Sequence, residues 1–421
     1  MVARPFNAKA ETANAVPLTA EASSCRRVAM RAMVSALKTP LIYSWTNSRF
    51  DGPLALKVVQ VLPALDGGGV EQGTLEIARA LVAAGHESVV VSSGGRLVDT
   101  LSDAGSRHVA WDIGRKRPSI AFDVLRFRRW LDRERPDVVH ARSRIPAWVA
   151  WLAWRRMAPA ARPRFVTTVH GLYRVGRYSA VMTRGERVIA VSETAHRYAL
   201  DNYPGLDANR VIRIYRGIDA TRFNKGFRPS PDWLRRWRAA YPALGDRPMV
   251  VLPGRITRLK GHAEFIAAMA HLRTNGVDAV GVIVGGVEPR HRAYREALAK
   301  QAPELVFTGH RSDVREIMAH AAAVVSLSTR PESFGRTVLE ALSLGTPVVG
   351  YDHGGVGEIL AAVYPEGRVP VGDHVAAADR LTRILADRHA ACQAVRDHDF
   401  EVERMCAETL AVYAQLGRAA T

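Results

Sequence analysis

The stretch RPESFGRTVLEALSLGTPVVG, residues 330–350, joins a turn, a helix-like apolar run and a short strand, and it carries two acids. Glu332 falls in the expected turn and Glu340 within the expected helix. Eight helical residues would separate the two carboxylates by about 12 Å. Between them, the amides of residues 334–336 would lie at the positive end of the helix. The stretch therefore predicts a site that holds an anion in the middle and hydroxyl groups on either side.

A purely structural explanation of the same stretch also exists. Glu332 would then be a favourable charge at a helix N-terminus, and Glu340 an exposed helical residue. However, Glu340 lies in the run TVLEALSLGTPVV, which is otherwise almost wholly apolar or small. A carboxylate buried in such a run is costly without a partner. We therefore favour a functional role for both acids.

The same alternation of short apolar strands and helical runs extends in both directions along the chain. Strands such as LKVVQVL, PDVVHA, RFVTTV, MVVLPG and AVVSLS, separated by helices, indicate parallel sheets covered on both faces. We predict an α/β protein with two doubly wound, Rossmann-like domains. The expected parts are an extension over 1–54, a first domain over 55–225, a linker helix over 226–245, a second domain over 246–385, and terminal helices over 386–421 that cross back to the first domain.

The extension over residues 1–54 has no clear period, and we expect it to be disordered. Its segment CRRVAMRAMVSALKTPLIYSW invites comparison with a signal peptide, but Lys38 and Pro40 interrupt a short apolar part. A membrane-touching helix is the alternative. The three cysteines are too few and too scattered for a disulfide framework or a zinc site, which indicates a reducing, cytoplasmic compartment.

The net charge of +18 allows three partners: nucleic acid, an anionic membrane surface, or an anionic small substrate. Nucleic-acid binding would require a binding module or a stacking surface with interleaved aromatic residues. The stretches RFRRWLDRER, WVAWLAWRRM and WLRRWR instead resemble amphipathic helices, which would equally suit membrane lipids. We therefore expect no nucleic-acid partner, and we expect these helices to be able to contact the inner face of the membrane.

Polar residues follow several of the predicted strands, and ligands of open parallel sheets bind beyond these strand ends. The glycine loop DGGGVEQ opens a helix, where backbone amides favour an anion, although any tight turn has this composition. His140 and His170 end two strands and suit hydrogen bonding to a ligand or, equally, to a neighbouring loop. In GRITRLKGH, Arg255 and Lys260 would clamp a diphosphate, unless they are merely solvated surface cations.

Taken together, these pieces resemble the retaining glycosyltransferases of the GT-B fold, specifically glycosyltransferase family 4. The resemblance rests on RPESFGRTVLEALSLGTPVVGYDHGGVGEIL, with GGGVEQGTLEIARAL, PDVVHARS, VHG, VIAVSE, RGID and GRITRLKGH in the same order. It covers about residues 56–417. The spacing of the two acids in this setting is the specific signal, and the other motifs support it.

The resemblance implies a role for each matching residue. The donor would be a UDP- or GDP-hexose, used as a substrate, with no permanently bound cofactor. Glu332 would bind hydroxyls of the transferred sugar, Glu340 the ribose, and His170 the sugar near its reacting carbon. Charges of the diphosphate would be neutralised by Arg255 and Lys260. The donor would also meet the backbone of residues from both domains: Gly68, Gly69, Ser333, Phe334 and Gly335.

Two positions depart from the family pattern. Arg142 stands where many relatives carry a second histidine, and Arg216 where asparagine is common. We expect both replacements to bear on the acceptor. None of the motifs quoted above contains a D-x-D element to hold a metal ion, so we predict metal-independent transfer, with Arg255 and Lys260 stabilising the leaving group.

The resemblance further implies transfer to a hydroxyl of a cell-envelope glycan or glycolipid, as in lipopolysaccharide core or surface polysaccharide synthesis. A nucleotide-sugar epimerase or phosphorylase of the same fold is the alternative. A basic nucleic-acid-binding protein and a catalytically silent scaffold are more distant ones. We expect a cytoplasmic enzyme that can associate peripherally with the inner face of the cell membrane.

Overall fold

The structure is a computed structural model that describes residues 55–115 and 120–418. The extension predicted over 1–54, with its signal-like segment, lies outside the described residues. In the part of the chain that the structure describes, every helix is too short or too polar to cross a bilayer.

The first sheet contains seven parallel strands in the order β3-β2-β1-β4-β5-β6-β7. Its strands are β1 (Lys57–Val61), β2 (Glu87–Ser92), β3 (Arg107–Ala110), β4 (Val138–Ala141), β5 (Arg164–Val169), β6 (Arg187–Ala190) and β7 (Val211–Arg213). The helices between them are α2 (Gly69–Ala83), α3 (Val98–Asp103), α4 (Ile120–Glu134), α5 (Arg144–Arg155) and α6 (Glu193–Asn202). Short 3₁₀ turns lie at Pro159–Ala161, Ser179–Thr183 and Ala208–Arg210.

The second sheet contains six parallel strands in the order β10-β9-β8-β11-β12-β13. Its strands are β8 (Met249–Pro253), β9 (Val280–Val284), β10 (Val306–Gly309), β11 (Ala323–Ser326), β12 (Val348–Tyr351) and β13 (Arg368–Val369). Its helices are α8 (His262–Thr274), α9 (Arg292–Gln301), α10 (Val314–His320), α11 (Arg336–Ser343), α12 (Gly354–Val363), α13 (His374–Ala386) and α14 (Arg388–Gln393). Helices α7 (Pro231–Ala240) and α15 (Val402–Arg418) flank this unit in the sequence, and 3₁₀ turns lie at Pro242–Leu244, Pro289–His291 and Pro365–Gly367.

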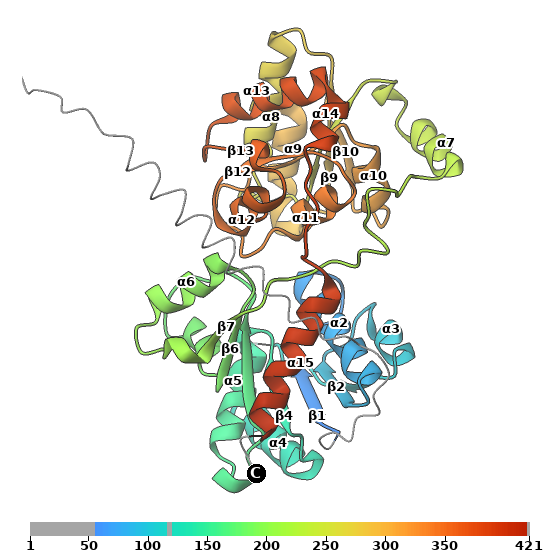
Figure 1. Ribbon diagram of the computed structural model, residues 1–421. Helices are drawn as coiled ribbons and strands as arrows, with labels where there is room; N and C mark the ends of the chain where they lie inside the picture. The colour runs from blue at the N-terminus through green and yellow to red at the C-terminus, as the bar shows by residue number, and fades with distance from the viewer. Residues whose placement is uncertain (1–54, 116–119, 419–421) are drawn as a thin grey trace, which may run out of the picture. The chain divides into compact units, whose positions relative to one another are not determined.

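This arrangement confirms the prediction of two doubly wound, Rossmann-like sheets (Figure 1). The central strands are continuous apolar runs because helices cover both faces of a parallel sheet. In β8 and β9 every residue is buried. The sequence analysis missed strands β3 and β13 at the sheet edges. β3 has the half-exposed pattern RHVA, and β13 has only two residues, so neither forms an apolar run.

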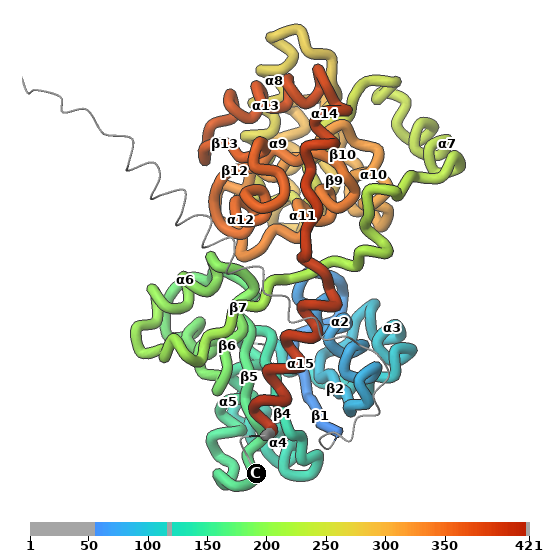
Figure 2. Tube along the Cα trace, in the orientation of Figure 1, coloured from blue at the N-terminus to red at the C-terminus, as the bar shows by residue number. Residues whose placement is uncertain are grey.

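The chain passes between the two sheets twice, and the two crossings run side by side (Figure 2). The amide of Ile218 donates to the carbonyl of Phe400 at 3.1 Å, and the amide of Val402 donates to the carbonyl of Ile218 at 3.0 Å. Gly217 makes this approach possible, since a Cβ there would lie 2.1 Å from the carbonyl oxygen of Glu401. The second crossing leads into α15.

Helix α15 packs against the first sheet and α2, not against the second sheet that precedes it in the sequence (Figure 1). Its apolar face, which includes Met405, Tyr413 and Leu416, shares one core cluster with strand residues such as Val58 and Val138. The last helix therefore completes the core of the first sheet.

Candidate active site

Glu332 lies in the loop between β11 and α11 and is held through one of its two carboxylate oxygens. Lys260 Nζ donates to Oε1 at 2.8 Å, and the Ser328 hydroxyl donates to the same oxygen. Among the residues that the structure describes, neither a hydrogen bond nor an ion pair reaches Oε2. One oxygen thus anchors the side chain, and the other remains able to accept hydrogen bonds from a ligand.

The charge of Glu332 is stabilised by its surroundings. Burial raises the pKa of this carboxyl, but the Lys260 ammonium, the Ser328 hydroxyl and the ring of His353 together outweigh burial and leave the pKa below its usual value. Glu332 is therefore an ionised hydrogen-bond acceptor at neutral pH rather than a proton donor.

Glu340 lies on α11 and shares the guanidinium of Arg336 with a carboxylate of the first unit. Arg336 Nε donates to Glu340 Oε1 at 2.9 Å, and Arg336 Nη2 donates to Glu76 Oε1 on α2 at 3.0 Å. Burial, together with the nearby Glu76 carboxylate, raises the pKa of Glu340 although Arg336 opposes the shift. Burial lowers the pKa of Arg336, but its two carboxylate partners more than compensate and leave it raised. This bridge, which the sequence analysis missed, joins the expected ribose carboxylate to α2.

Helix α11 begins at Arg336 and has Gly335 as its N-cap in the left-handed region, at φ 99°. No side chain caps this end of the helix. Its first amides are therefore available to an anion, and they lie in the chain between Glu332 and Glu340. Phe334 is buried and packs beside Tyr215, with 6.5 Å between the ring centroids.

The glycine loop before α2 has the same character. Gly68 is the N-cap of α2, and no N-cap side chain accepts a hydrogen bond from the first amides of this helix. Gly69 is the first helical residue, and a Cβ there would meet no atom within 4 Å. The loop therefore leaves open space at Gly69, where the helix begins.

Arg216 and Arg142 lie beneath this loop and are both buried. Arg216 Nη2 donates to the Gly69 carbonyl at 2.8 Å and lies 3.5 Å from Glu76, while Arg142 Nη1 donates to Gln60 Oε1 at 3.1 Å. Burial lowers the pKa of Arg216 to about 10. These contacts correct the expectation that both arginines bear on the acceptor: they support α2 and the glycine loop from below.

His170 is joined to the donor loop of the second unit. The Ser333 hydroxyl donates to the His170 carbonyl at 2.6 Å. The Nε2 atom of His170 is buried and has no hydrogen-bond partner within the described part of the chain. Burial, followed by the charges of Arg142 and Arg216, lowers the pKa of His170 well below its usual value. A neutral imidazole with an unused nitrogen therefore lies beside Ser333, ready for a polar group of a ligand.

The structure separates the two cations, Lys260 and Arg255, that were predicted to bind the diphosphate together. Lys260 contacts Glu332, but Arg255 is 77% exposed and forms an ion pair with Glu288 at 3.1 Å. The structure therefore does not bring Arg255 together with Lys260 and Glu332. A role for Arg255 in binding a diphosphate requires its side chain to leave Glu288.

His140 is a structural residue. Its ring nitrogens lie 2.6 Å from the Tyr413 hydroxyl of α15 and 2.6 Å from the Thr168 hydroxyl. Burial lowers the pKa of His140 well below its usual value, so the ring is neutral. Of the two explanations open for His140, the structure supports hydrogen bonding inside the protein.

The sequence analysis also missed the residues that shape the donor loop from behind. The amide of Gly355 donates to the Glu332 carbonyl at 2.8 Å, and a Cβ on Gly355 would lie 2.3 Å from the backbone of Phe334. A Cβ on Gly354 would lie 2.6 Å from the Glu332 carbonyl oxygen. The glycine pair in YDHGGVGEIL is the signal that identifies this close approach.

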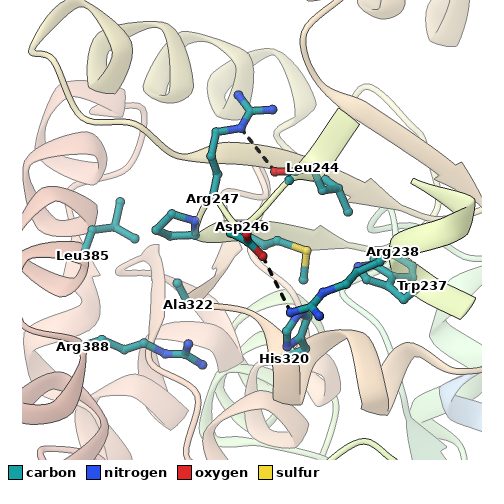
Figure 3. Close-up of a pocket in the computed structure, with 12 residues that line it drawn as sticks. Trp237, Arg238, Leu244, Asp246, Arg247, His320, Ala322, Leu385 and Arg388 are labelled. Carbon is teal, nitrogen blue, oxygen red and sulfur yellow. Dashed lines mark hydrogen bonds and ion pairs between the residues drawn. The ribbon is translucent and has the colours of Figure 1, made fainter. Parts of the chain in front are cut away.

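The tryptophans of the basic helices face the protein. On α7, Trp233 and Trp237 are buried and stack with 5.2 Å between their centroids, and Trp233 Nε1 donates to Asp313 at 2.7 Å. A cavity of about 210 Å³ beside α7 is lined in part by Arg238 and Asp246, whose side chains form an ion pair (Figure 3). None of the predicted donor residues lines this cavity, so we assign it to the packing of α7 against the second sheet.

Family models match most of the chain. The model for Glycosyltransferase Family 4 matches residues 67–222, and that for Glycosyl transferases group 1 matches residues 235–398. The chain is a GT-B glycosyltransferase of the family 4 type. The predicted GT-B fold and family membership are thereby confirmed.

Individual proteins agree with this assignment. A D-inositol 3-phosphate glycosyltransferase of Xylanimonas cellulosilytica is 27% identical over 83% of this chain and 92% of its own length. A glycosyltransferase structure from Rickettsia africae is 26% identical with a TM-score of 0.74, covering 86% of this chain and 98% of its own. Anabaena HepE in complex with UDP-glucose shares the fold, with 21% identity, a TM-score of 0.70, and coverage of 85% and 100%.

Proposed function

We propose that this family 4 glycosyltransferase retains the anomeric configuration and moves a hexose from a UDP- or GDP-hexose to an acceptor hydroxyl. The observation that carries the proposal is the Glu332 carboxylate, which is ionised, anchored through one oxygen by Lys260 and Ser328, and adjacent to the uncapped start of α11. The presence of UDP-glucose in the HepE complex supports a donor of this class.

The two substrates would bind mainly to different domains. Residues 246–385 would bind the nucleotide sugar and residues 55–225 the acceptor. Glu332 Oε2 accepts hydrogen bonds from hydroxyls of the hexose, and Glu340 accepts them from the ribose once Arg336 yields. The diphosphate rests against the amides that begin α11 and those that follow Gly68, where helix N-termini favour anions.

Transfer proceeds on one face of the sugar. The acceptor oxygen forms a bond to the anomeric carbon as the bond from that carbon to the diphosphate oxygen breaks. The proton of the acceptor hydroxyl passes to the departing phosphate oxygen. Lys260, Arg255 and the helix amides stabilise the charge that develops on this oxygen, and His170 Nε2 orients a hydroxyl of the donor sugar. This assignment predicts that transfer does not require a divalent metal ion.

The acceptor that we propose is a glycan or glycolipid of the cell envelope, reached at the cytoplasmic face of the membrane. On α4, Phe122 and Leu125 are 64% and 46% exposed, and Arg126 and Arg129 on the same helix are exposed as well. Exposed apolar residues among cations suit an anionic surface, to which each cation contributes about 1 kcal/mol. Equal binding of the protein to neutral and anionic vesicles at low salt would contradict this part of the proposal.

A donor screen followed by product analysis tests the function. UDP- and GDP-hexoses are compared for thermal stabilisation of the protein and of its Glu340→Ala variant, which we expect to lose most of the stabilisation. With the best donor and an envelope glycan extract, NMR of the product reports the anomeric configuration, with and without EDTA. Inversion, or activity that EDTA abolishes and manganese restores, refutes the mechanism, and conversion of donor without any acceptor favours an epimerase.

A further inference from the structure

A second cavity lies beyond the carboxyl ends of strands in the first sheet. It has a volume of about 540 Å³ and is lined by Pro63 after β1, by residues 143–145 at the start of α5, and by residues 174–179 in the loop after β5. Ligands of open parallel sheets bind at this edge. The cavity contains none of the donor residues described above, so it offers room for a second substrate.

Three guanidinium groups surround this cavity. Arg144, Arg174 and Arg177 all line it. Within residues 55–115 and 120–418, none of the three forms an ion pair with a carboxylate. The cavity therefore carries positive charge that the described part of the protein does not neutralise.

Arg144 is held in place without being neutralised. Its guanidinium carbon lies 4.5 Å from the ring centroid of Tyr173 and 5.1 Å from that of Tyr178. Its Nη1 lies 3.5 Å from the Ser179 hydroxyl, which itself donates to the Arg174 carbonyl at 2.8 Å. Stacking on aromatic rings fixes the plane of a guanidinium and leaves its donors available to a ligand.

The start of α5 adds backbone donors to the same cavity. Ser143 is the N-cap of this 12-residue helix, but its hydroxyl caps no amide. The amides of Arg144 and Ile145 are the first of the helix, and Pro146 has none. These two amides and the helix dipole favour an anion where the three guanidinium groups also converge.

The loop that bears two of the arginines follows His170, which we place in the proposed donor site. Arg174 follows His170 by four residues, and the His170 carbonyl accepts a hydrogen bond from Ser333 of the donor loop. The same loop thus joins the cavity to the proposed donor site, as the position of an acceptor requires. Val175 and Tyr178, which also line the cavity, are exposed.

We propose that this cavity binds a phosphate group of the acceptor, carried either by a soluble sugar or polyol phosphate or by the headgroup of a lipid-linked acceptor. The inference rests on the proposed glycosyl transfer and specifies its acceptor class. Three guanidinium forks and two amides match the several oxygens and the charge of a phosphate, whereas a carboxylate is satisfied by a single fork.

Calorimetric titration of inorganic phosphate, in the presence of saturating UDP or GDP, tests the cavity directly. The nucleotide occupies the donor diphosphate site, so that phosphate reports on the second site alone. Arg174→Ala/Arg177→Ala changes two exposed loop residues, and we expect it to weaken phosphate binding about tenfold or more. Arg174→Lys/Arg177→Lys, which keeps the charge but loses the forks, should lie in between.

The matched control is Arg236→Ala/Arg292→Ala, which removes the same charge from exposed positions on α7 and α9 and should bind phosphate as the unchanged protein does. Sedimentation with phosphatidylglycerol and phosphatidylcholine vesicles distinguishes the sources. Loss of both vesicle and phosphate binding in the cavity variant indicates a lipid headgroup, and loss of phosphate binding alone indicates a soluble phosphate.

The proposal fails if phosphate does not bind beside UDP or GDP, or if the cavity variant and the control bind it equally well. Thermal unfolding of each variant shows whether the fold is intact. Nucleotide binding is measured in the same titrations. Its absence would refute the proposed function, while the phosphate result would still decide what the cavity binds.

Discussion

Replacing the Glu332 carboxylate by an amide of the same shape separates sugar recognition from nucleotide recognition. In the structure, Glu332 Oε1 accepts hydrogen bonds from both Lys260 and Ser328. In Glu332→Gln the amide oxygen must stay on this side, because both neighbours are donors. The NH₂ group then takes the place of Oε2, and an acceptor of hydrogen bonds becomes a donor.

The size of the effect follows from the bond that is lost. A hydrogen bond to a charged group contributes about 1.5–3 kcal/mol. Loss of one such bond to a sugar hydroxyl reduces kcat/KM about 10- to 150-fold. The fold should hardly be affected, because the side chain of Lys260 is 34% exposed and water can solvate it when its partner loses charge.

The assay compares the variant with the unchanged enzyme in two measurements. Steady-state kinetics gives kcat/KM for the sugar donor, and calorimetry gives the affinity for the free nucleoside diphosphate. We expect the first to fall and the second to stay equal or improve, because Lys260 is left with more uncompensated charge for the diphosphate. Glu296→Gln, at an exposed position on α9, is the control.

Two results would refute this reasoning. Unchanged kcat/KM in Glu332→Gln would show that Oε2 does not meet the donor sugar. Equal weakening of donor and nucleoside diphosphate would show that the substitution disturbs the loop before α11 rather than one hydrogen bond.

Further predictions concern the buried charges and glycines around the site. Arg336→Ala removes the shared partner of the Glu76 and Glu340 carboxylates, whose side chains are 8% and 16% exposed. Denaturant titrations should show a loss of about 3–5 kcal/mol in the free energy of unfolding. Arg336→Lys should recover part of this loss. Burial lowers the pKa of His262 from 6.5 to about 4, so the unfolded chain takes up a proton below pH 6.5 while the folded one does not, and this residue's contribution to stability declines by about 1.4 kcal/mol per pH unit between pH 6.5 and 4. The decline should be absent in His262→Gln, and parallel stability curves of the two proteins over this range would contradict it. Gly355→Ala places a Cβ against the Phe334 backbone, and it should lower the free energy of unfolding by about 1–3 kcal/mol. The same variant should also lose the thermal stabilisation that the donor gives to the unchanged protein. Gly205→Ala is the control, because a Cβ there has open space around it and should change stability little.

The fold was predictable from the sequence because its signals are local. Buried parallel strands such as β8 and β9 are continuous apolar runs, and each is followed by a helix of ordinary length. The sequence analysis did not predict strands β3 and β13, which lie at sheet edges. The residues of β3 are partly exposed to solvent and β13 has only two residues, so neither strand forms an apolar run. The family resemblance was readable for a similar reason, since its motifs are short and contiguous.

The sequence by itself determined the two doubly wound sheets, the family, and the residue types at the strand ends, including Glu332, Lys260 and His170. Only the tertiary structure decided which of these side chains meet. It joined Arg336 to Glu76 across 260 residues, withdrew His140 into a hydrogen bond with Tyr413, and turned Arg255 toward Glu288. It also gathered Arg144, Arg174 and Arg177 around one cavity. Periodicity reports which face of an element is buried, whereas a site depends on distances between elements that are far apart in the chain, and these arise only when the sheets are packed.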